Sequence, residues 1–447
     1  MPKIDLSRFN NKHFLALAGN GILSMFGLGF IYLLYVSLTV ADVGKWFYFF
    51  TVLGLCEAVR NGFLGTATVK FYAGKKGEDA VSILGSIWLL ALVITLLIWA
   101  INLACLPFMC YVEDPSMRMV INWLGLTFLS SLPFSVVFWI LQAEEDYGRI
   151  LKLRLVNSGS MIIIFGTLVL SKQMTIEKAF MYNFITNCLT SAVALVWGAK
   201  IFTLFKCRKE NILEIVHFGK YSLATTLSSS LLRSTDTFII QNMLGSAALA
   251  IYGLPVRLME IVEIPLRSFV GTGMSGMATA YNNNDMGQVA RILTKYSGML
   301  TVVFIPMALL VLLFADIPIS LLGHHKLDGT AAANIYRLFM VFAVMYPIDR
   351  FNGITLDVIH KPQINFQKVL VMLAVNAAAD YVGIMLLGNI YGVAFGAFLT
   401  TLAGIIFGYI HLRKYVDYTI GGILHEGYIE TKLFMAKNIP FLRQRTL

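Results

Sequence analysis

Charged residues interrupt several long apolar stretches of this 447-residue sequence, and their spacing indicates possible chemistry. Stretch 247–274 contains Arg257, Glu260, Glu263 and Arg267, which on a helix would share an arc of about 120°. The i, i+4 spacing of Glu263 and Arg267 favours an ion pair. A guanidinium also makes forked contacts with phosphate oxygens, so this face could instead bind an anionic ligand. Both roles stay open at this point.

Other apolar stretches carry related groups. Stretch 45–69 places three polar residues on one helix face, and stretch 219–243 carries a polar stripe within about 100° of helix surface. The candidates for binding an anion are Arg60, Arg233, Arg257 and Arg267. The candidates for a polar cavity or for ion coupling are Glu57, Asn61, Asp236, Glu260, Glu263 and Asp380.

Composition identifies the solvent of these helices as lipid. Hydrophobic residues make up 57% of the chain and charged residues 13%, against roughly 25% charged in a soluble domain. Apolar runs of about 20 residues can cross a hydrocarbon core about 30 Å thick. We predict an all-α polytopic membrane protein with spans at 14–38, 45–69, 82–109, 119–141, 150–170, 179–204, 219–243, 247–274, 297–322, 331–356, 366–388 and 391–412.

The basic residues set the expected orientation. With a cytoplasmic N-terminus, 24 of the 35 Lys and Arg residues fall on the cytoplasmic side, five on the other side and six within spans. This is the bias of the positive-inside rule, so both termini are expected in the cytoplasm. The net charge of +10 thus reflects topology, and nucleic acid is not expected as a partner because the basic residues are spread over many segments.

The sequence also matches itself. At an offset of 206 residues, Glu57 aligns with Glu263, and at an offset of 219 Asn157 aligns with Asn376. We therefore predict two six-helix bundles in the same orientation, related by a pseudo-two-fold axis along the membrane normal, with a central cleft suited to alternating access. The predicted parts are a cytoplasmic segment 1–13, bundles 14–209 and 210–412, and a basic cytoplasmic tail 413–447 that lies along the inner leaflet.

No pattern for covalent chemistry is present. The chain has no P-loop, no nucleophile elbow and no HExxH motif. Its five cysteines are scattered, and the adjacent His324 and His325 have no companion ligands, so neither a disulfide framework nor a metal site is expected. We predict a protein that is not an enzyme and has no cofactor, with H⁺ or Na⁺ as a possible coupling ion.

One stretch of the chain contains Arg233, Asp236, Phe238, Ile239, Ile240, Gly245, Ala248, Tyr252, Arg257 and Pro265. In these residues the chain resembles the polysaccharide flippases of the multidrug/oligosaccharidyl-lipid/polysaccharide exporter superfamily. Segment 276–281 departs from the basic or proline-containing turn of many members. The resemblance implies a bacterial inner-membrane monomer that moves an oligosaccharide on polyprenyl pyrophosphate to the outer leaflet, with the four arginines at the pyrophosphate and membrane lipids around it.

Three alternatives compete with this interpretation. A cation-coupled multidrug exporter of the same superfamily would share the fold, but it would favour unpaired carboxylates, whereas here arginines accompany them. A major-facilitator transporter would carry a characteristic charged loop after the second span, and segment 70–76 does not match it. A membrane-embedded glycosyltransferase would need a large outer loop with catalytic side chains, and no predicted outer loop is long enough.

Overall fold

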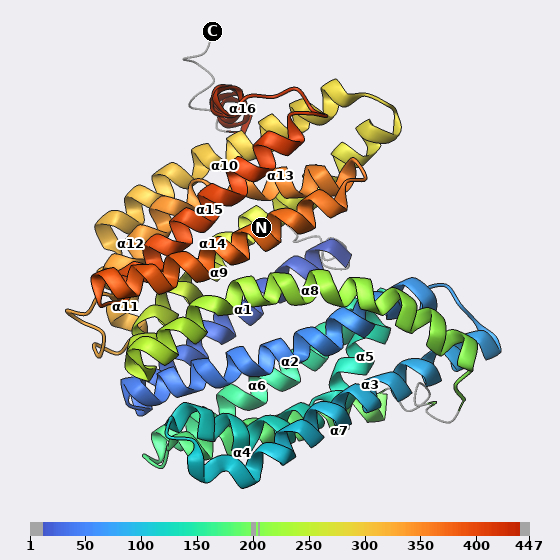
Figure 1. Ribbon diagram of the computed structural model, residues 1–447, viewed down its shortest axis with the longest axis vertical. Helices are drawn as coiled ribbons and strands as arrows, with labels where there is room; N and C mark the ends of the chain where they lie inside the picture. Colours follow the sequence, from blue (N-terminus) through green and yellow to red (C-terminus); the bar gives the residue numbers. More distant parts are fainter. Residues whose placement is uncertain (1–11, 198–202, 204–205, 439–447) are drawn as a thin grey trace, which may run out of the picture. The chain divides into compact units, whose positions relative to one another are not determined.

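The computed structural model describes residues 12–197, 203 and 206–438, and every regular element in that part of the chain is a helix (Figure 1). The fold is all-α, as predicted. Most of the predicted segment 1–13 and the end of the predicted tail, residues 439–447, lie outside the described residues.

Each of the twelve predicted spans corresponds to one helix or to one interrupted helix. The fourth span is the pair α4–α5, the ninth is α10 with α11, and the tenth is the pair α12–α13. The elements are α1 (Lys12–Ser37), α2 (Val40–Tyr72), α3 (Gly77–Cys105), the 3₁₀ helix η2 (Leu106–Tyr111), α4 (Pro115–Ser130), α5 (Leu132–Ala143), α6 (Tyr147–Leu170), α7 (Ile176–Trp197), α8 (Lys209–Leu244), α9 (Ser246–Asn282), α10 (Met286–Phe314), α11 (Asp316–Leu322), α12 (Ala332–Ala343), α13 (Tyr346–Val358), α14 (Pro362–Leu387), α15 (Tyr391–Leu412) and α16 (Ile420–Asn438).

Length and composition mark many of these helices as membrane spans. Within the described residues, six helices qualify by themselves, namely α3 with η2, α6, α7, α10, α14 and α15, and the α4–α5 pair, bent by 45°, makes a seventh. Helices α2, α8 and α9 have 33, 36 and 37 residues, which is ample for a bilayer. They are less apolar because they carry the polar and charged residues of the candidate site. Such helices must turn those residues toward protein or water.

The chain divides into two compact units, Met1–Ser234 and Thr235–Leu447, and the boundary lies within α8. In the N-terminal unit, α2 packs on α3 and on both parts of α4–α5, while α7 packs on α5 and α6. In the C-terminal unit, α9 packs on α10 and on both α12 and α13, while α15 packs on α13 and α14. Helices in the same order therefore pair in the same way, which is the internal repeat expected from the sequence.

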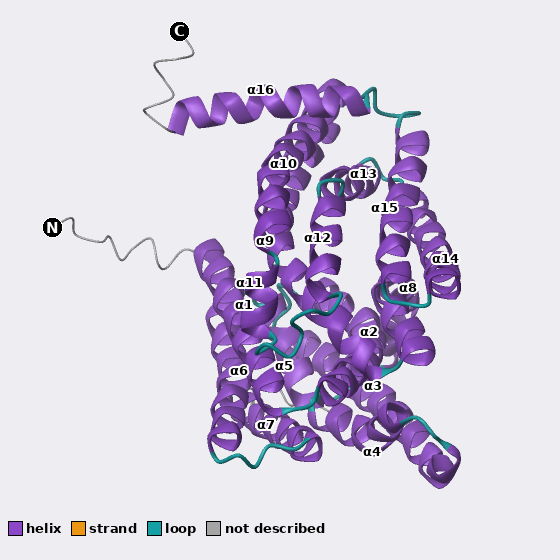
Figure 2. Cartoon of the chain, turned by 90° about the vertical axis from the view of Figure 1, so that its left-hand side faces the viewer, coloured by secondary structure: helices purple, strands orange, loops and turns teal. Residues whose placement is uncertain are grey.

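The C-terminal helix α16 lies crosswise over the end of α10 (Figure 2). Lys295 Nζ contacts Glu430 Oε2 at 2.7 Å, and a Cβ atom added at Gly298 would lie 2.1 Å from the carbonyl oxygen of Ile423. Gly427 is equally crowded against Gly298, so glycine at both positions lets the two backbones touch. The face of α16 turned away from α10 carries exposed apolar side chains: Leu424, Tyr428, Ile429 and Leu433.

This backbone contact yields a test of the position of α16. Gly427→Leu places a side chain where α10 lies, so we expect α16 to leave α10 and trypsin to cleave after Lys432 at least about tenfold faster, because cleavage follows the population of the undocked helix. Gly421→Leu is the matched control, since Gly421 has open space around it. Equal cleavage rates in the two variants would contradict the docked position.

Candidate functional site

The charged residues of α9 pair along one face of the helix. Arg257 Nη1 donates to Glu260 Oε1 at 2.7 Å, and Arg267 Nη2 donates to Glu263 Oε2 at 3.1 Å. These are the i, i+3 and i, i+4 neighbours that a helix brings together. The Arg257 and Arg267 side chains are nevertheless 39% and 65% exposed, so pairing does not enclose their guanidinium groups.

A further arginine reaches this face from the interrupted tenth span. Arg350 lies in the second turn of α13, and its Nη2 is 4.0 Å from Glu263 Oε2. Its side chain is 52% exposed. The sequence signal for Arg350 is the charged pair Asp349 and Arg350, which follows Pro347 inside a predicted span, but Arg350 is not among the predicted site residues. Its proximity to Glu263 depends on how α13 packs on α9.

The composition of this face suits an anionic group. Charged side chains in hydrocarbon cost about 2.5–3.5 kcal/mol each, so exposed arginines on spanning helices must face water or polar protein surface. Together, Arg257, Arg267 and Arg350 exceed Glu260 and Glu263 by one positive charge. Guanidinium groups have several N–H donors in a fixed fork, which matches the oxygens of a phosphate.

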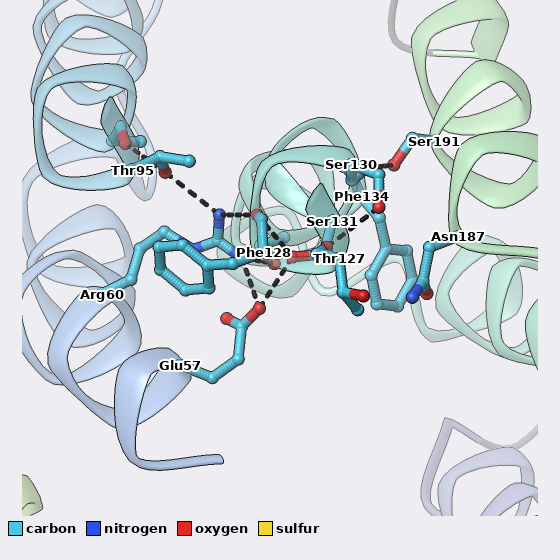
Figure 3. Close-up of polar contacts among 12 residues, drawn as sticks. Glu57, Arg60, Thr95, Thr127, Phe128, Ser130, Ser131, Phe134, Asn187 and Ser191 are labelled. Atoms are coloured by element: carbon cyan, nitrogen blue, oxygen red, sulfur yellow. Dashed lines mark hydrogen bonds and ion pairs between the residues drawn. The ribbon is translucent and has the colours of Figure 1, made fainter. Parts of the chain in front are cut away.

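The arginine of α2 has a different environment (Figure 3). The Arg60 side chain is fully buried, and its guanidinium also lies over the Phe128 ring, with Cζ 4.2 Å from the ring centroid. Within the described chain, its hydrogen bonds at 2.5–3.3 Å go to Glu57 Oε1, Ser131 Oγ, Ser135 Oγ, Thr95 Oγ1 and the Phe128 carbonyl oxygen.

The burial of Arg60 decides between the two roles that the sequence left open, an internal ion pair and the binding of an anionic ligand. The five acceptors bond Nη1 and Nη2, and Nε is buried without a partner. Because the side chain is fully buried, a ligand cannot reach it in this conformation, so the geometry favours an internal ion pair with Glu57. Glu57 itself is 31% exposed and also accepts from Ser131 Oγ at 2.8 Å. The pair thus ties α2 to the junction of α4 and α5.

The bend between α4 and α5 has a side-chain cause. Ser191 of α7 donates to the Ser130 carbonyl oxygen at 2.6 Å and accepts from the Phe134 N–H at 3.4 Å. These two backbone groups would otherwise bond each other, so the hydroxyl is inserted into the helix ladder, which bends a helix. Pro133 lies at the same junction and removes another backbone donor.

The remaining candidates of the N-terminal unit lie at the surface of that unit. Asn61 of α2 is exposed, and its Oδ1 lies over Gly65, where a Cβ atom would come within 2.4 Å of it. Arg233 of α8 is also exposed. Whether either residue contacts a ligand stays a prediction.

The candidate carboxylates of the C-terminal unit meet in its interior. Asn376 Nδ2 donates to Asp236 Oδ1 at 3.1 Å and to Asp380 Oδ2 at 3.2 Å, and the Tyr252 hydroxyl also donates to Asp236. Asp380 is fully buried. It fits there because α15 has a glycine opposite: a Cβ atom at Gly396 would lie 2.0 Å from Asp380 Oδ1.

This carboxylate cluster is not neutralised by a basic side chain. Among the described residues, neither Asp236 nor Asp380 forms an ion pair with Lys, Arg or His. Asp380 Oδ1 and Asn376 Oδ1 are buried without hydrogen-bond partners. Unpaired buried oxygens are costly unless a proton or a hard cation satisfies them. The cluster therefore has the chemistry of a small cation or proton site.

The two units differ at the position of this cluster. Asn157, which aligns with Asn376, donates to Asn187 Oδ1 and Thr190 Oγ1 at 3.4 and 3.2 Å. The offset that aligns the two asparagines places Met161 at the position of Asp380. Both units therefore have a hydrogen-bonding asparagine at this position, but its partners differ: Asn157 donates to α7, whereas Asn376 donates to the two carboxylates Asp236 and Asp380.

The Arg60 contacts predict a large stability effect. Arg60→Ala leaves Glu57 without its charged partner and two serine hydroxyls without their donor, and breaking a buried ion pair costs about 3–5 kcal/mol. We expect the melting temperature of the purified protein to fall by at least about 5 °C. Arg149→Ala is the control, because its pair with Asp146 is exposed and such pairs contribute about 0–1 kcal/mol. Similar melting temperatures for both variants would refute the proposed enclosure.

Comparison with solved structures identifies the fold. The chain is similar to an inward-facing multidrug resistance MATE family transporter of the MOP superfamily, with TM-score 0.73, 15% identity and coverage of 95% of this chain and 96% of that chain. It is also similar to the lipid II flippase MurJ in an inward closed conformation, with TM-score 0.71, 14% identity and coverage of 94% and 91%. This two-lobed transporter fold is thus shared by proteins of both kinds.

Comparison of sequences adds the family. No curated protein matches the chain. A family model described as polysaccharide biosynthesis protein matches residues 38–326, which run from α2 to the loop after α11 and include the whole of α9. On this match, which covers more than half of its length, the chain belongs to the polysaccharide biosynthesis protein family.

Proposed function

We propose that this protein moves an oligosaccharide linked to polyprenyl pyrophosphate from the inner to the outer leaflet of the bacterial cytoplasmic membrane by alternating access. The observation that carries the proposal is the exposed charged face of α9, which together with Arg350 of α13 has three arginines against two glutamates. Membership of a polysaccharide biosynthesis family and a fold shared with a lipid II flippase support it. The Arg257, Arg267 and Arg233 side chains would hold the pyrophosphate.

The same arrangement would separate the parts of the substrate. The pyrophosphate needs charge-assisted hydrogen bonds, the sugars need hydroxyl and amide partners, and the lipid tail can stay in the bilayer. A negative cell interior would assist outward movement of the anion by about 2.3 kcal/mol per charge per 100 mV. We further propose that the protein acts as a monomer with both termini in the cytoplasm and α16 against the inner leaflet, where its exposed apolar side chains would meet lipid.

A cation-coupled multidrug exporter is the second candidate. The fold shared with a multidrug transporter, the buried Asp380 and the partly buried Asp236 beside it favour this candidate. Such a pump would bind cationic drugs, which an arginine-rich face repels. Both candidates are compatible with a coupling ion, and we propose that H⁺ or Na⁺ binds at Asp236, Asn376 and Asp380.

Proteoliposomes test the function directly. Flipping of a fluorescent polyprenyl-pyrophosphate oligosaccharide is measured beside export of a cationic dye. We expect movement of the oligosaccharide without dye export, and loss of that movement in Arg233→Ala and Arg257→Ala at unchanged protein level. Arg149→Ala, an exposed arginine on α6, serves as the control. Dye export alone would establish the exporter, and normal flipping in both arginine variants would exclude their role in substrate binding.

The carboxylate cluster predicts ion coupling. Asp380→Asn keeps the shape of the side chain but removes its charge and its proton site, so neither a Na⁺ nor a pH gradient can act through it. We expect the stimulation of flipping by the effective gradient to fall to about onefold, that is, no stimulation. Asp328→Asn, in the loop before α12, is the control. If a gradient still stimulates the Asp380 variant as it does the unmodified protein, the coupling site lies elsewhere.

A further inference from the structure

Two arginines from different helices converge on the same carboxylate oxygen in the C-terminal unit. Glu263 Oε2 accepts from Arg267 Nη2 at 3.1 Å and lies 4.0 Å from Arg350 Nη2. Both arginine side chains are at least half exposed, whereas Glu263 is 22% exposed. The carboxylate is therefore the partly buried centre of the group, and the two guanidinium groups at its sides are more exposed.

The distances show that Glu263 does not satisfy both arginines. Arg267 makes one hydrogen bond to it, while 4.0 Å is beyond hydrogen-bond length for Arg350. Within the described residues, Glu263 is the one charged partner of Arg350. A carboxylate has two oxygens on one carbon, whereas a diphosphate is larger and has more acceptor oxygens. A diphosphate can therefore contact both guanidinium groups, whereas Glu263 at these distances hydrogen-bonds only Arg267.

The internal repeat provides a comparison. Glu57 occupies the equivalent position in α2, and its arginine is fully enclosed by hydroxyl and carbonyl acceptors. In the C-terminal unit, no such enclosure surrounds Arg267 and Arg350. Glu57 thus pairs with a fully buried arginine in the N-terminal unit. Glu263, at the equivalent position, lies between two exposed arginines in the C-terminal unit.

The backbone near Arg350 is anchored. Lys368 Nζ contacts Asp349 Oδ1 at 2.8 Å and the Asp349 carbonyl oxygen at 3.0 Å, and the Lys368 side chain is almost fully buried. This ties the first turns of α13 to α14. Arg350 can therefore move its long side chain toward a ligand while its backbone stays in place.

We propose that Glu263 is an internal substitute for the phosphate of the ligand: it holds Arg267 in the ligand-free protein, and a phosphate or diphosphate group displaces it and is bound by Arg267 and Arg350 together. Arg350 is then a binding residue for the substrate. The inference rests on the proposed function and specifies which group of the substrate binds at which arginines.

The test measures binding of inorganic pyrophosphate to the full-length protein in nanodiscs of zwitterionic phosphatidylcholine. Glu263→Gln removes the competing anion, so we expect affinity to rise at least about tenfold, equivalent to about 1.4 kcal/mol. Arg350→Ala and Arg267→Ala each remove a charged donor and should weaken binding at least about tenfold. Glu430→Gln is the matched control, because Glu430 is a similarly exposed carboxylate in an ion pair of the same unit and should leave affinity unchanged.

The outcomes separate this inference from the proposed function. Unchanged or weaker binding in Glu263→Gln, or unchanged binding in Arg350→Ala, overturns the inference even if flipping of the oligosaccharide is observed. Absence of both binding and flipping in the unmodified protein overturns both. Nanodiscs containing phosphatidylglycerol identify the source of the phosphate: competition by this lipid supports the exchange with Glu263 but assigns the site to a bilayer headgroup, and competition by polyprenyl pyrophosphate alone assigns it to the substrate.

Discussion

A charged side chain inside the hydrocarbon layer needs an ion-pair partner, water, or a proton or ion that removes its charge, because hydrocarbon does not solvate charges. The structure meets this requirement in three ways. Arg60 is enclosed by acceptors from α2, α3 and the α4–α5 pair. The arginines of α9 and α13 keep an exposed surface and only partial pairing. The Asp236 and Asp380 carboxylates are surrounded by neutral donors alone. Each arrangement has a different chemical use: the first fixes helices, the second can exchange anions, and the third can take a cation.

The helices that match the twelve predicted spans could be predicted from the sequence because most of them lie in long apolar runs, and hydrocarbon thickness fixes the length of such runs. The repeat was also visible, since Glu57 and Glu263 fall at related positions and the helices that carry them pair alike in both units. Helix composition alone was less informative for α2, α8 and α9, whose polar faces lower their mean hydropathy. The packing of α2 on α3, α4 and α5, and of α9 on α10, α12 and α13, places these two helices in their units.

The environment of each charge could not be predicted in the same way. Arg60 and Arg267 both lie one turn from a glutamate, and the sequence treats them as equivalent. Their difference arises from a bend: Ser131 and Ser135 reach Arg60 where the fourth span is interrupted, and a hydroxyl from α7 together with Pro133 interrupts it. Arg350 was not predicted as a site residue for a related reason: its neighbour Glu263 lies on another helix. Long-range packing decides both cases, and spacing along one helix does not report it.

Shared fold leaves the cargo open, since structures at 14% and 15% identity include both a flippase and a drug transporter. The choice of transported molecule must therefore depend on a few positions. One of these positions, residue 396, is a glycine. Asp380 Oδ1 occupies the space that a methyl group at residue 396 would fill. Replacing glycine with alanine adds only one methyl group. At Gly396, however, this methyl group would displace the Asp380 carboxylate from its position. Gly396 thus leaves the space that Asp380 occupies, and mutational surveys aimed at polar residues would not include this glycine.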